Sequence, residues 1–256
     1  MKTRSVWGSF VFGILFLVST AHATALSDTS AILYVDWNRY NEQVQWSSAN
    51  FAYNGADADL DGVTDSLYLG GWVDDPAFAA VAMVTGDSMG IAETGVDFAS
   101  ATAHSLADGI GASPPNEVVY TSATSHRGKS FSPYADGEIE FFFDYIISQD
   151  FSTDLPEEGA SGYSVAEFHV SSSGEELWYG LVDFNNAGTI ETGSMSFTLD
   201  VLASSSYYLE GHVYTSAYAR SPVEANPIPE PTTVLLLGAT LLGIAGLGRE
   251  RFLKRS

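Results

Sequence analysis

The sequence predicts an all-β domain, an antiparallel two-sheet β-sandwich of jelly-roll-like architecture, and three observations favour this fold. Apolar and polar residues alternate over several short segments, which is the period of a half-buried strand. Gly, Asn, Ser or Pro separates these segments at intervals of about ten to fifteen residues, near the spacing of strands in antiparallel sandwiches. No long segment has the apolar period of a helix, which argues against a βαβ fold.

The N-terminal half of the predicted domain is the less regular half. Two short apolar segments, 31–35 and 118–124, predict strands, and two Ala-rich segments, 79–84 and 96–104, are weaker candidates. Between them, the segment 105–116 contains two glycines and two consecutive prolines, so it is a predicted loop.

The alternation is clearest in the C-terminal half. Ile139, Phe141 and Phe143 fall on one face of a strand, and Glu138 and Glu140 fall on the other. Further strands are expected at 163–170, 176–184, 195–201 and 207–218. The predicted core includes Phe141, Phe143, Phe197, Leu199 and Val201.

The N-terminus carries a signal that lies outside this domain. Residues 1–23 start with Lys2 and Arg4, continue with an apolar segment and end with small residues at Ala21 and Ala23. This order is typical of a secretory signal peptide that is cleaved on export. The chain that follows divides into a predicted β-sandwich domain and a Pro-rich linker, 24–220 and 221–228.

The last residues, 229–256, combine a Pro-Glu-Pro triplet, the uncharged apolar segment 234–248 and a basic end. As a helix rising about 1.5 Å per residue, the apolar segment reaches about 22 Å, so it spans a hydrocarbon core of about 30 Å only with bilayer thinning or snorkelling basic side chains. Basic residues stay in the cytoplasm, which predicts the domain on the far side of the membrane.

This tail resembles the PEP-CTERM sorting signal of Gram-negative bacteria. The residues that carry the resemblance are Pro229, Glu230, Pro231, Arg249 and Arg251. The resemblance implies that an exosortase, a membrane-embedded enzyme similar to cysteine transpeptidases, recognises and removes the tail. It further implies an inner-membrane intermediate and then release to the cell surface or to an exopolysaccharide matrix. The alternative is an ordinary tail anchor, and the domain's own activity does not follow from the tail.

The composition limits the partners of the domain. The chain has a net charge of −22 and no cysteine. Of the 32 acidic residues, Glu230 and Glu250 lie in the tail. Residues 24–226 therefore contain 30 acidic and four basic residues, which gives this part of the chain a net charge of −26. Such acidity excludes nucleic acid and anionic membrane surfaces as partners. Bound divalent cations or a saline exterior would offset the repulsion, and simple solubility explains it equally well.

One acidic segment has the ligand spacing of a calcium loop. Carboxylates at alternate positions converge where a glycine at the sixth position allows a sharp turn. The expected Ca²⁺ ligands are Asp57, Asp59, Asp61, the carbonyl of Val63, and Asp65. Tyr68 stands where an EF-hand has a bidentate glutamate, so binding should be weak, and an acidic turn between strands is the alternative.

Other residues suggest carbohydrate binding or hydrolysis. Tyr208, Tyr214 and Tyr218 share one face of the last predicted strand, where they suit stacking on sugar rings or a second sheet contact. Glu138 and Glu140 are about 6.5 to 7 Å apart along one strand face, a separation that glycosidase carboxylates adopt, although solvated faces often carry such pairs. Ser88 lies in a Gly-x-Ser-x-Gly motif that lacks the required helix, so a Gly-Ser turn is the better interpretation.

We therefore expect a non-enzymatic exported protein of the cell surface or of an exopolysaccharide-rich biofilm matrix. The first alternative is a calcium-dependent carbohydrate-binding module, supported by the acidic segment and the tyrosine-bearing strand. The second alternative is a secreted polysaccharide hydrolase.

Overall fold

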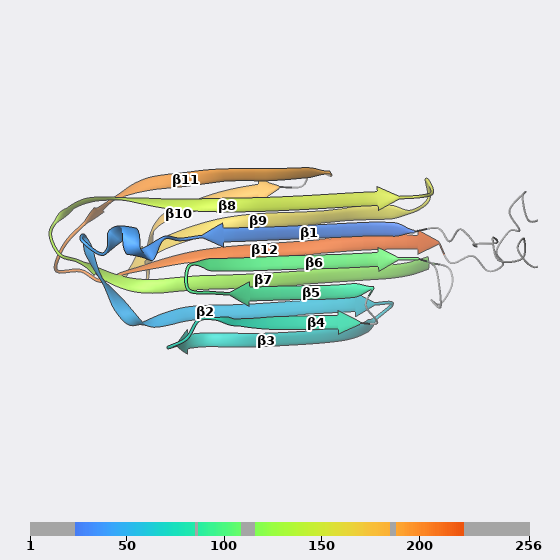
Figure 1. The fold of residues 1–256 in the computed structure, drawn as a ribbon, viewed down its shortest axis with the longest axis horizontal. Coiled ribbons are helices and arrows are strands. Elements are labelled where there is room, and N and C mark those ends of the chain that lie inside the picture. Colours follow the sequence, from blue (N-terminus) through green and yellow to red (C-terminus); the bar gives the residue numbers. More distant parts are fainter. Residues whose placement is uncertain (1–23, 85–86, 109–115, 185–187, 223–256) are drawn as a thin grey trace, which may run out of the picture. The chain divides into compact units, whose positions relative to one another are not determined.

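The computed structural model describes residues 24–84, 87–108, 116–184 and 188–222. Within these ranges the chain forms twelve strands and one short 3-10 helix, η1 (Trp37–Tyr40), and the strands build two antiparallel six-stranded sheets that stack on one another (Figure 1). The predicted all-β, two-sheet fold is confirmed. The jelly-roll likeness stays a prediction, since that architecture has about eight strands.

The two sheets have equal numbers of strands. Sheet A has the order β11-β8-β1-β6-β5-β4 and sheet B the order β10-β9-β12-β7-β2-β3. The strands of sheet A are β1 (Ala25–Tyr34), β4 (Phe78–Val84), β5 (Ser88–Thr94), β6 (Phe98–Ala107), β8 (Gly137–Thr153) and β11 (Thr189–Val201). The strands of sheet B are β2 (Val44–Leu60), β3 (Val63–Val73), β7 (Asn116–Pro133), β9 (Gly159–Ser172), β10 (Glu175–Phe184) and β12 (Tyr207–Pro222).

The chain passes repeatedly between the sheets. Only β2-β3, β4-β5-β6 and β9-β10 are consecutive strands paired in one sheet of the described chain, and every other connection crosses to the opposite sheet. The first strand, β1, consequently pairs with β6 and β8, and the last, β12, pairs with β7 and β9. Both central strands are therefore held by partners that are distant in sequence.

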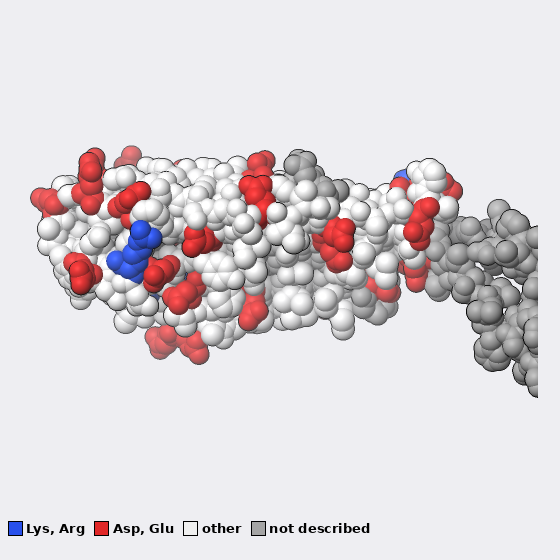
Figure 2. Space-filling model, turned by 45° about the horizontal axis from the view of Figure 1, so that its top comes forward, with Lys and Arg blue, Asp and Glu red and all other residues white. Residues whose placement is uncertain are grey.

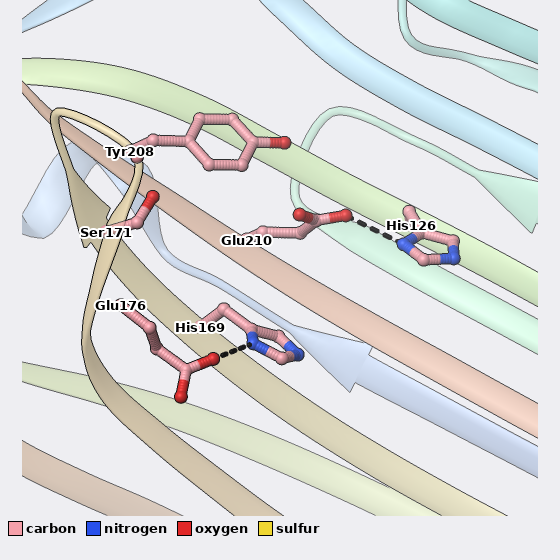
Figure 3. Close-up of a pocket in the computed structure, with 7 residues that line it drawn as sticks. His126, His169, Ser171, Glu176, Tyr208 and Glu210 are labelled. Carbon is pink, nitrogen blue, oxygen red and sulfur yellow. Dashed lines mark hydrogen bonds and ion pairs between the residues drawn. The ribbon is translucent and has the colours of Figure 1, made fainter.

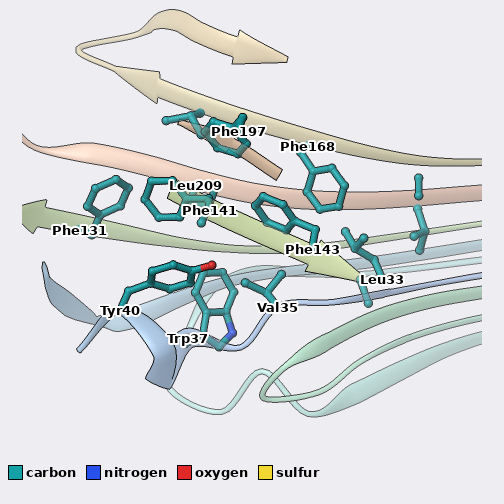
Figure 4. Packing of buried hydrophobic residues seen from close by; sticks show 14 of the residues in the cluster. Leu33, Val35, Trp37, Tyr40, Phe131, Phe141, Phe143, Phe168, Phe197 and Leu209 are labelled. Carbon is teal, nitrogen blue, oxygen red and sulfur yellow. The ribbon is translucent and has the colours of Figure 1, made fainter. Parts of the chain in front are cut away.

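One part of the interior is filled by large aromatic side chains, as the alternation predicted. The five expected core residues are all buried: Phe141, Phe143, Phe197, Leu199 and Val201. Phe143 contacts Phe168 across the sheets with ring centroids 3.7 Å apart, and Tyr40 of η1 packs on Phe141 at 5.0 Å (Figure 4). Burial of these rings supplies the main apolar stabilisation of this part.

Another part of the interior is filled by alanine, glycine and small hydroxyl residues. Ser105 Oγ of sheet A donates to the carbonyl of Ala217 in sheet B at 3.1 Å and lies 3.0 Å from Thr121 Oγ1. Gly90 of sheet A approaches the opposite backbone closely, because a Cβ there would lie 2.6 Å from the carbonyl oxygen of Ser122. Hydrogen bonds between the layers satisfy polar groups that burial would otherwise penalise.

The first and last strands of this domain have their outer ends together. Ala25 at the start of β1 and Ala219 near the end of β12 belong to one buried cluster with Ala107 and Val119. Strand β12 continues two residues past the predicted domain boundary at residue 220. The predicted signal peptide 1–23, the tail 229–256 and its apolar segment 234–248 lie outside the described residues. Among the residues that are described, no helix has the length and apolarity needed to cross a membrane.

Candidate functional site

The candidate site lies on the outer face of sheet B, along β12 and its two neighbours. Alternate residues of β12 point inward and are buried, and the residues between them point outward. The strand register places outward residues of β7 and β9 directly beside those of β12. In chain order, the outward residues in the middle of β12 are Tyr208, Glu210, His212, Tyr214, Ser216 and Tyr218.

Two stacked imidazoles stand at the centre of this face. His126 of β7 and His212 of β12 are register partners, and their ring centroids are 4.0 Å apart with planes at 16°. Glu210 Oε1 lies 2.7 Å from His126 Nδ1, and Thr124 Oγ1 lies 2.8 Å from His212 Nε2. Both rings are therefore held in fixed orientations by hydrogen bonds.

Glu167 of β9 extends this network toward β10. Its Oε2 lies 3.0 Å from His212 Nδ1 and 3.5 Å from His169 Nε2. The other ring nitrogen of His169, Nδ1, lies 3.2 Å from Glu176 Oε2. Three histidines that look scattered in the sequence thus converge on one face, because β12 stands between β7 and β9.

The protonation states in this network follow from burial and from neighbouring groups. Burial lowers the pKa of His212, and the adjacent His126 lowers it further. Burial by itself raises the pKa of Glu167, but the hydrogen bonds and charge of His212 and His169 outweigh it and hold that pKa below its usual range. At neutral pH the carboxylate is consequently ionised and the imidazole of His212 is neutral.

Acidic side chains are spread over the face of the domain that Figure 2 shows, and basic side chains are few, since residues 24–226 include four of them. Arg127 of β7 is buried, and its Nη2 donates to Asn50 Oδ1 at 2.8 Å. Lys129 Nζ lies 5.9 Å from the ring centroids of Trp37 and Trp46. Both basic residues therefore point away from the outer face of sheet B, where Arg220 at the end of β12 is the Lys or Arg that the described strands place outward.

Aromatic side chains from three strands lie next to the histidine network. Tyr208 of β12, Phe51 of β2 and Trp72 of β3 have ring centroids 5.7 to 6.3 Å apart. Gly128 of β7 makes this contact possible, because a Cβ there would lie 2.2 Å from Tyr208 Oη. The tyrosine ring crosses β7 over this glycine and reaches β2, and Trp72 at the sheet edge is 56 % exposed.

The predicted tyrosines share the outer face of β12 but do not form one cluster. Tyr214 follows Tyr208 by six positions, which is about 20 Å along a strand. Tyr214 Oη lies 3.2 Å from Tyr120 Oη. Burial is the largest cause, and this hydrogen bond the second, of a rise in the pKa of Tyr120 to about 12. Tyr218 lies beside Tyr120 in the strand register. The alternation in the sequence did not place Phe51 of β2 and Trp72 of β3 beside Tyr208, and of the three predicted tyrosines Tyr208 is the one that contacts them.

A pocket of about 270 Å³ opens beside Tyr208, between β7, β12, β9 and the turn that leads into β10 (Figure 3). Its lining residues are His126, His169, Ser171, Gly174, Glu176, Tyr208 and Glu210. Burial and the neighbouring carboxylate of Glu210 raise the pKa of Tyr208 above its ordinary range, so its hydroxyl stays a donor. The pocket therefore offers two carboxylates, two imidazoles and one phenol.

The predicted calcium loop is the turn of the β2-β3 hairpin. Asp61 and Gly62 have φ values of 51° and 82°, as a two-residue type I′ turn requires. The register pairs Ala58 with Asp65 and Asp59 with Thr64, so Asp59 points outward and Asp65 points toward sheet A. The expected carboxylates are thereby divided between the two faces of the hairpin.

Each of these carboxylates has a protein donor. Asp65 Oδ2 accepts from the backbone N–H of Met83 at 2.9 Å, and Asp61 Oδ1 accepts from that of Val118 at 2.9 Å. Tyr68 donates to Asp57, and this hydrogen bond raises the pKa of the phenol to about 12. The described residues contain no group of three or more His, Cys, Asp or Glu placed to hold a metal ion. Calcium binding, with Val63 as the carbonyl ligand, stays a prediction.

The residues considered for hydrolysis lie apart from this pocket. Ser88 is buried in β5, where its Oγ donates to the carbonyl of Tyr120 at 3.1 Å and accepts from the backbone N–H of Asp59 at 3.1 Å. Glu138 and Glu140 are exposed on β8, in sheet A. Comparisons with known protein families, curated proteins and solved structures found no match to this chain.

Proposed function

We propose that the chain is a non-enzymatic exported protein, sorted by a PEP-CTERM-type tail to the cell surface or exopolysaccharide matrix of a Gram-negative bacterium. One observation carries the proposal: the Pro-Glu-Pro triplet 229–231, the apolar segment 234–248 and a basic end follow one another in a chain whose residues 1–23 have the pattern typical of a signal peptide. Its partners are an exosortase and, before processing, the inner membrane.

The geometry of the domain is compatible with such a tether. Ala25 and Ala219 lie in one cluster, so β1 begins and β12 ends at the same end of the sandwich. A domain held at one end keeps the outer faces of both sheets accessible. The hydroxyl of Ser88 is buried and hydrogen-bonded within the sandwich, so it is not placed to act as a nucleophile on a polymer outside the domain.

Intact-mass spectrometry tests the proposal. The full chain is produced in a host with the sorting enzyme and in an isogenic host without it. We expect exported protein that lacks residues 1–23 in both hosts and also lacks 234–248 when the enzyme is present. A variant with alanine at both Pro229 and Pro231 should keep the tail in the host with the enzyme. The control variant Pro227→Ala, changed just before the motif, should lose the tail as the wild type does. Retention of the tail by wild-type protein in both hosts would refute sorting.

A carbohydrate-binding module is the second candidate function. The aromatic side chains of Tyr208, Phe51 and Trp72 favour it, because exposed rings stack on the apolar faces of sugars. Dependence on calcium would follow only if the β2-β3 turn binds the ion. Exopolysaccharide from the producing strain is the expected ligand source.

A further inference from the structure

The pocket beside Tyr208 and the neighbouring aromatic rings are aligned by the strand register. One row across sheet B runs from Trp72 through Phe51, Gly128 and Glu210 to His169. Because paired residues share a face, this row places an exposed indole and a phenyl ring at one end and a carboxylate with an imidazole at the other. Tyr208 covers the glycine in the middle and so connects the two ends.

The carboxylates at the polar end of the row are held in place by hydrogen bonds to histidines. His126 Nδ1 holds Glu210 at 2.7 Å, and His169 Nδ1 holds Glu176 at 3.2 Å (Figure 3). Each of these hydrogen bonds uses one oxygen of a carboxylate that can accept about four, so both carboxylates keep capacity for further donors. Groups fixed in this way lose little conformational entropy when a ligand binds.

The charge of the pocket selects the ligand. Glu176 and Glu210 line it, Glu167 lies next to it, and no outward-pointing residue of the described strands nearby is Lys or Arg. Arg220, the one outward Lys or Arg of β12, lies at the far end of the strand, where it donates to the carbonyl of Glu157. An anionic ligand would meet uncompensated negative charge, whereas hydroxyl groups donate to carboxylates.

We propose that the pocket and the rings of Tyr208, Phe51 and Trp72 bind one or two units of a neutral polysaccharide. Hydroxyl groups of a sugar donate to Glu210 and Glu176, and the apolar face of an adjoining sugar stacks on Trp72. A volume of about 270 Å³ lies below the range of roughly 300–1,000 Å³ typical of drug-sized ligands, which suits a single sugar ring in the pocket. Sugar binding here is independent of export, so a failed sorting experiment leaves it standing.

Affinity gel electrophoresis of the protein, in the form released by cells, tests the site. The gels contain hydroxyethyl cellulose, dextran, galactomannan or the neutral fraction of the producing strain's exopolysaccharide, with alginate as the anionic comparison. We expect at least one neutral polymer to retard the protein and alginate not to. Chelator should leave the retardation unchanged.

Two variants locate the binding. Glu210→Gln and Trp72→Ala should each weaken retardation about tenfold, the loss expected when one charge-assisted hydrogen bond or one stacked ring is removed. The matched control is Tyr134→Ala, an exposed aromatic residue that follows β7 and lies outside the site. Melting temperatures of all three variants are measured so that unfolding is not mistaken for lost binding.

Several results would overturn the proposal. Retardation by none of the neutral polymers, or by alginate alone, contradicts the ligand class. Retardation that persists in both site variants contradicts the location. Loss of retardation on addition of chelator would mean that the polysaccharide binds through a cation held elsewhere in the protein, and it would contradict binding in this pocket.

Discussion

His212 is the most enclosed of the three histidines on the outer face of sheet B, with a side chain that is 18 % exposed. Burial and His126 lower its pKa below the value of about 6.5 that histidine has in an unfolded chain. Between these two values the unfolded state binds more protons than the folded state, so the free energy of unfolding falls as the pH falls. Glu167 acts in the same direction at lower pH, because its pKa is depressed in the folded state.

We therefore predict that the melting temperature decreases as the pH is lowered from about 7 through 6.5 and below. His212→Gln, which cannot take up a proton, should flatten the decrease between pH 7 and about 5.5. His104→Gln is the control, because His104 lies on sheet A beside Asp28 and far from this network. Equal pH slopes in wild type and His212→Gln would contradict the prediction.

Asp59 and Asp61 decide whether the β2-β3 turn binds calcium. The hairpin divides the expected ligands between two faces, and each has a protein donor, so a bound ion would have an incomplete shell and a dissociation constant of about 10⁻⁴ to 10⁻³ M. At ten times that constant, the ion stabilises the fold by about 1.4 kcal/mol. Calcium should accordingly raise the melting temperature more than magnesium at equal ionic strength.

The calcium effect should vanish when both carboxylates are removed. Asp59→Ala combined with Asp61→Ala is compared with Asp200→Ala, an exposed acid on sheet A. Loss of the calcium-specific shift in the double variant alone would support the site. Identical responses of wild type to calcium and magnesium would reduce the turn to an acidic hairpin.

At the level of elements, strand β5 shows how closely the two sheets approach. A Cβ on Gly90 would lie 2.6 Å from the carbonyl oxygen of Ser122 and 3.1 Å from that of Asp57, both in the backbone of sheet B. Gly90→Ala should therefore push the sheets apart and cost about 1 to 3 kcal/mol in chemical denaturation. Gly159→Ala is the matched control, since its nearest neighbour would be 4.0 Å away, and it should be neutral. Equal stability of the two variants would mean that the sheets separate without cost.

The strands that the sequence predicted and those it missed differ in what fills their inward positions. Strand β8 was predicted because Ile139, Phe141 and Phe143 alternate with polar residues. Strand β3, which contains Gly70 and Gly71, was missed. Strands β2 and β5 were also missed, because their inward positions hold residues such as Ala56, Asn54 and Gly90, which carry little strand preference. Their burial depends on close contact with the opposite sheet, and only the fold supplies that contact.

The candidate site was predictable to the same limited extent. Alternation alone put Tyr208, Tyr214 and Tyr218 on one face of β12. It could not show that Phe51 and Trp72 join Tyr208, because this contact requires the strand order β12-β7-β2-β3 and a glycine under the tyrosine ring. The histidine network likewise depends on β9 and β7 flanking β12, a pairing of residues far apart in sequence.

At the scale of the whole domain, the large excess of acidic over basic side chains is the main electrostatic feature. Residues 24–226 have a net charge of −26, and the few basic side chains do little to offset it. Arg127 and Lys129 are directed into the sandwich, and ion pairs such as those of His126 and His169 weaken when the imidazole is neutral. Repulsion among surface carboxylates therefore opposes the compact state.

Because this repulsion acts between exposed charges, salt should relieve it. The Debye length falls from about 30 Å at 0.01 M to about 10 Å at 0.1 M salt, so added NaCl should raise the melting temperature. This rise should level off above roughly a few tenths molar salt, where the charges are already screened. A gain of 1 kcal/mol corresponds to about 2 to 4 °C for a domain of this size. KCl should act like NaCl, since screening depends on ionic strength and not on ion identity. A melting temperature that falls with salt would mean that favourable ion pairs outweigh the repulsion, and it would contradict the conclusion that surface charge opposes the compact state.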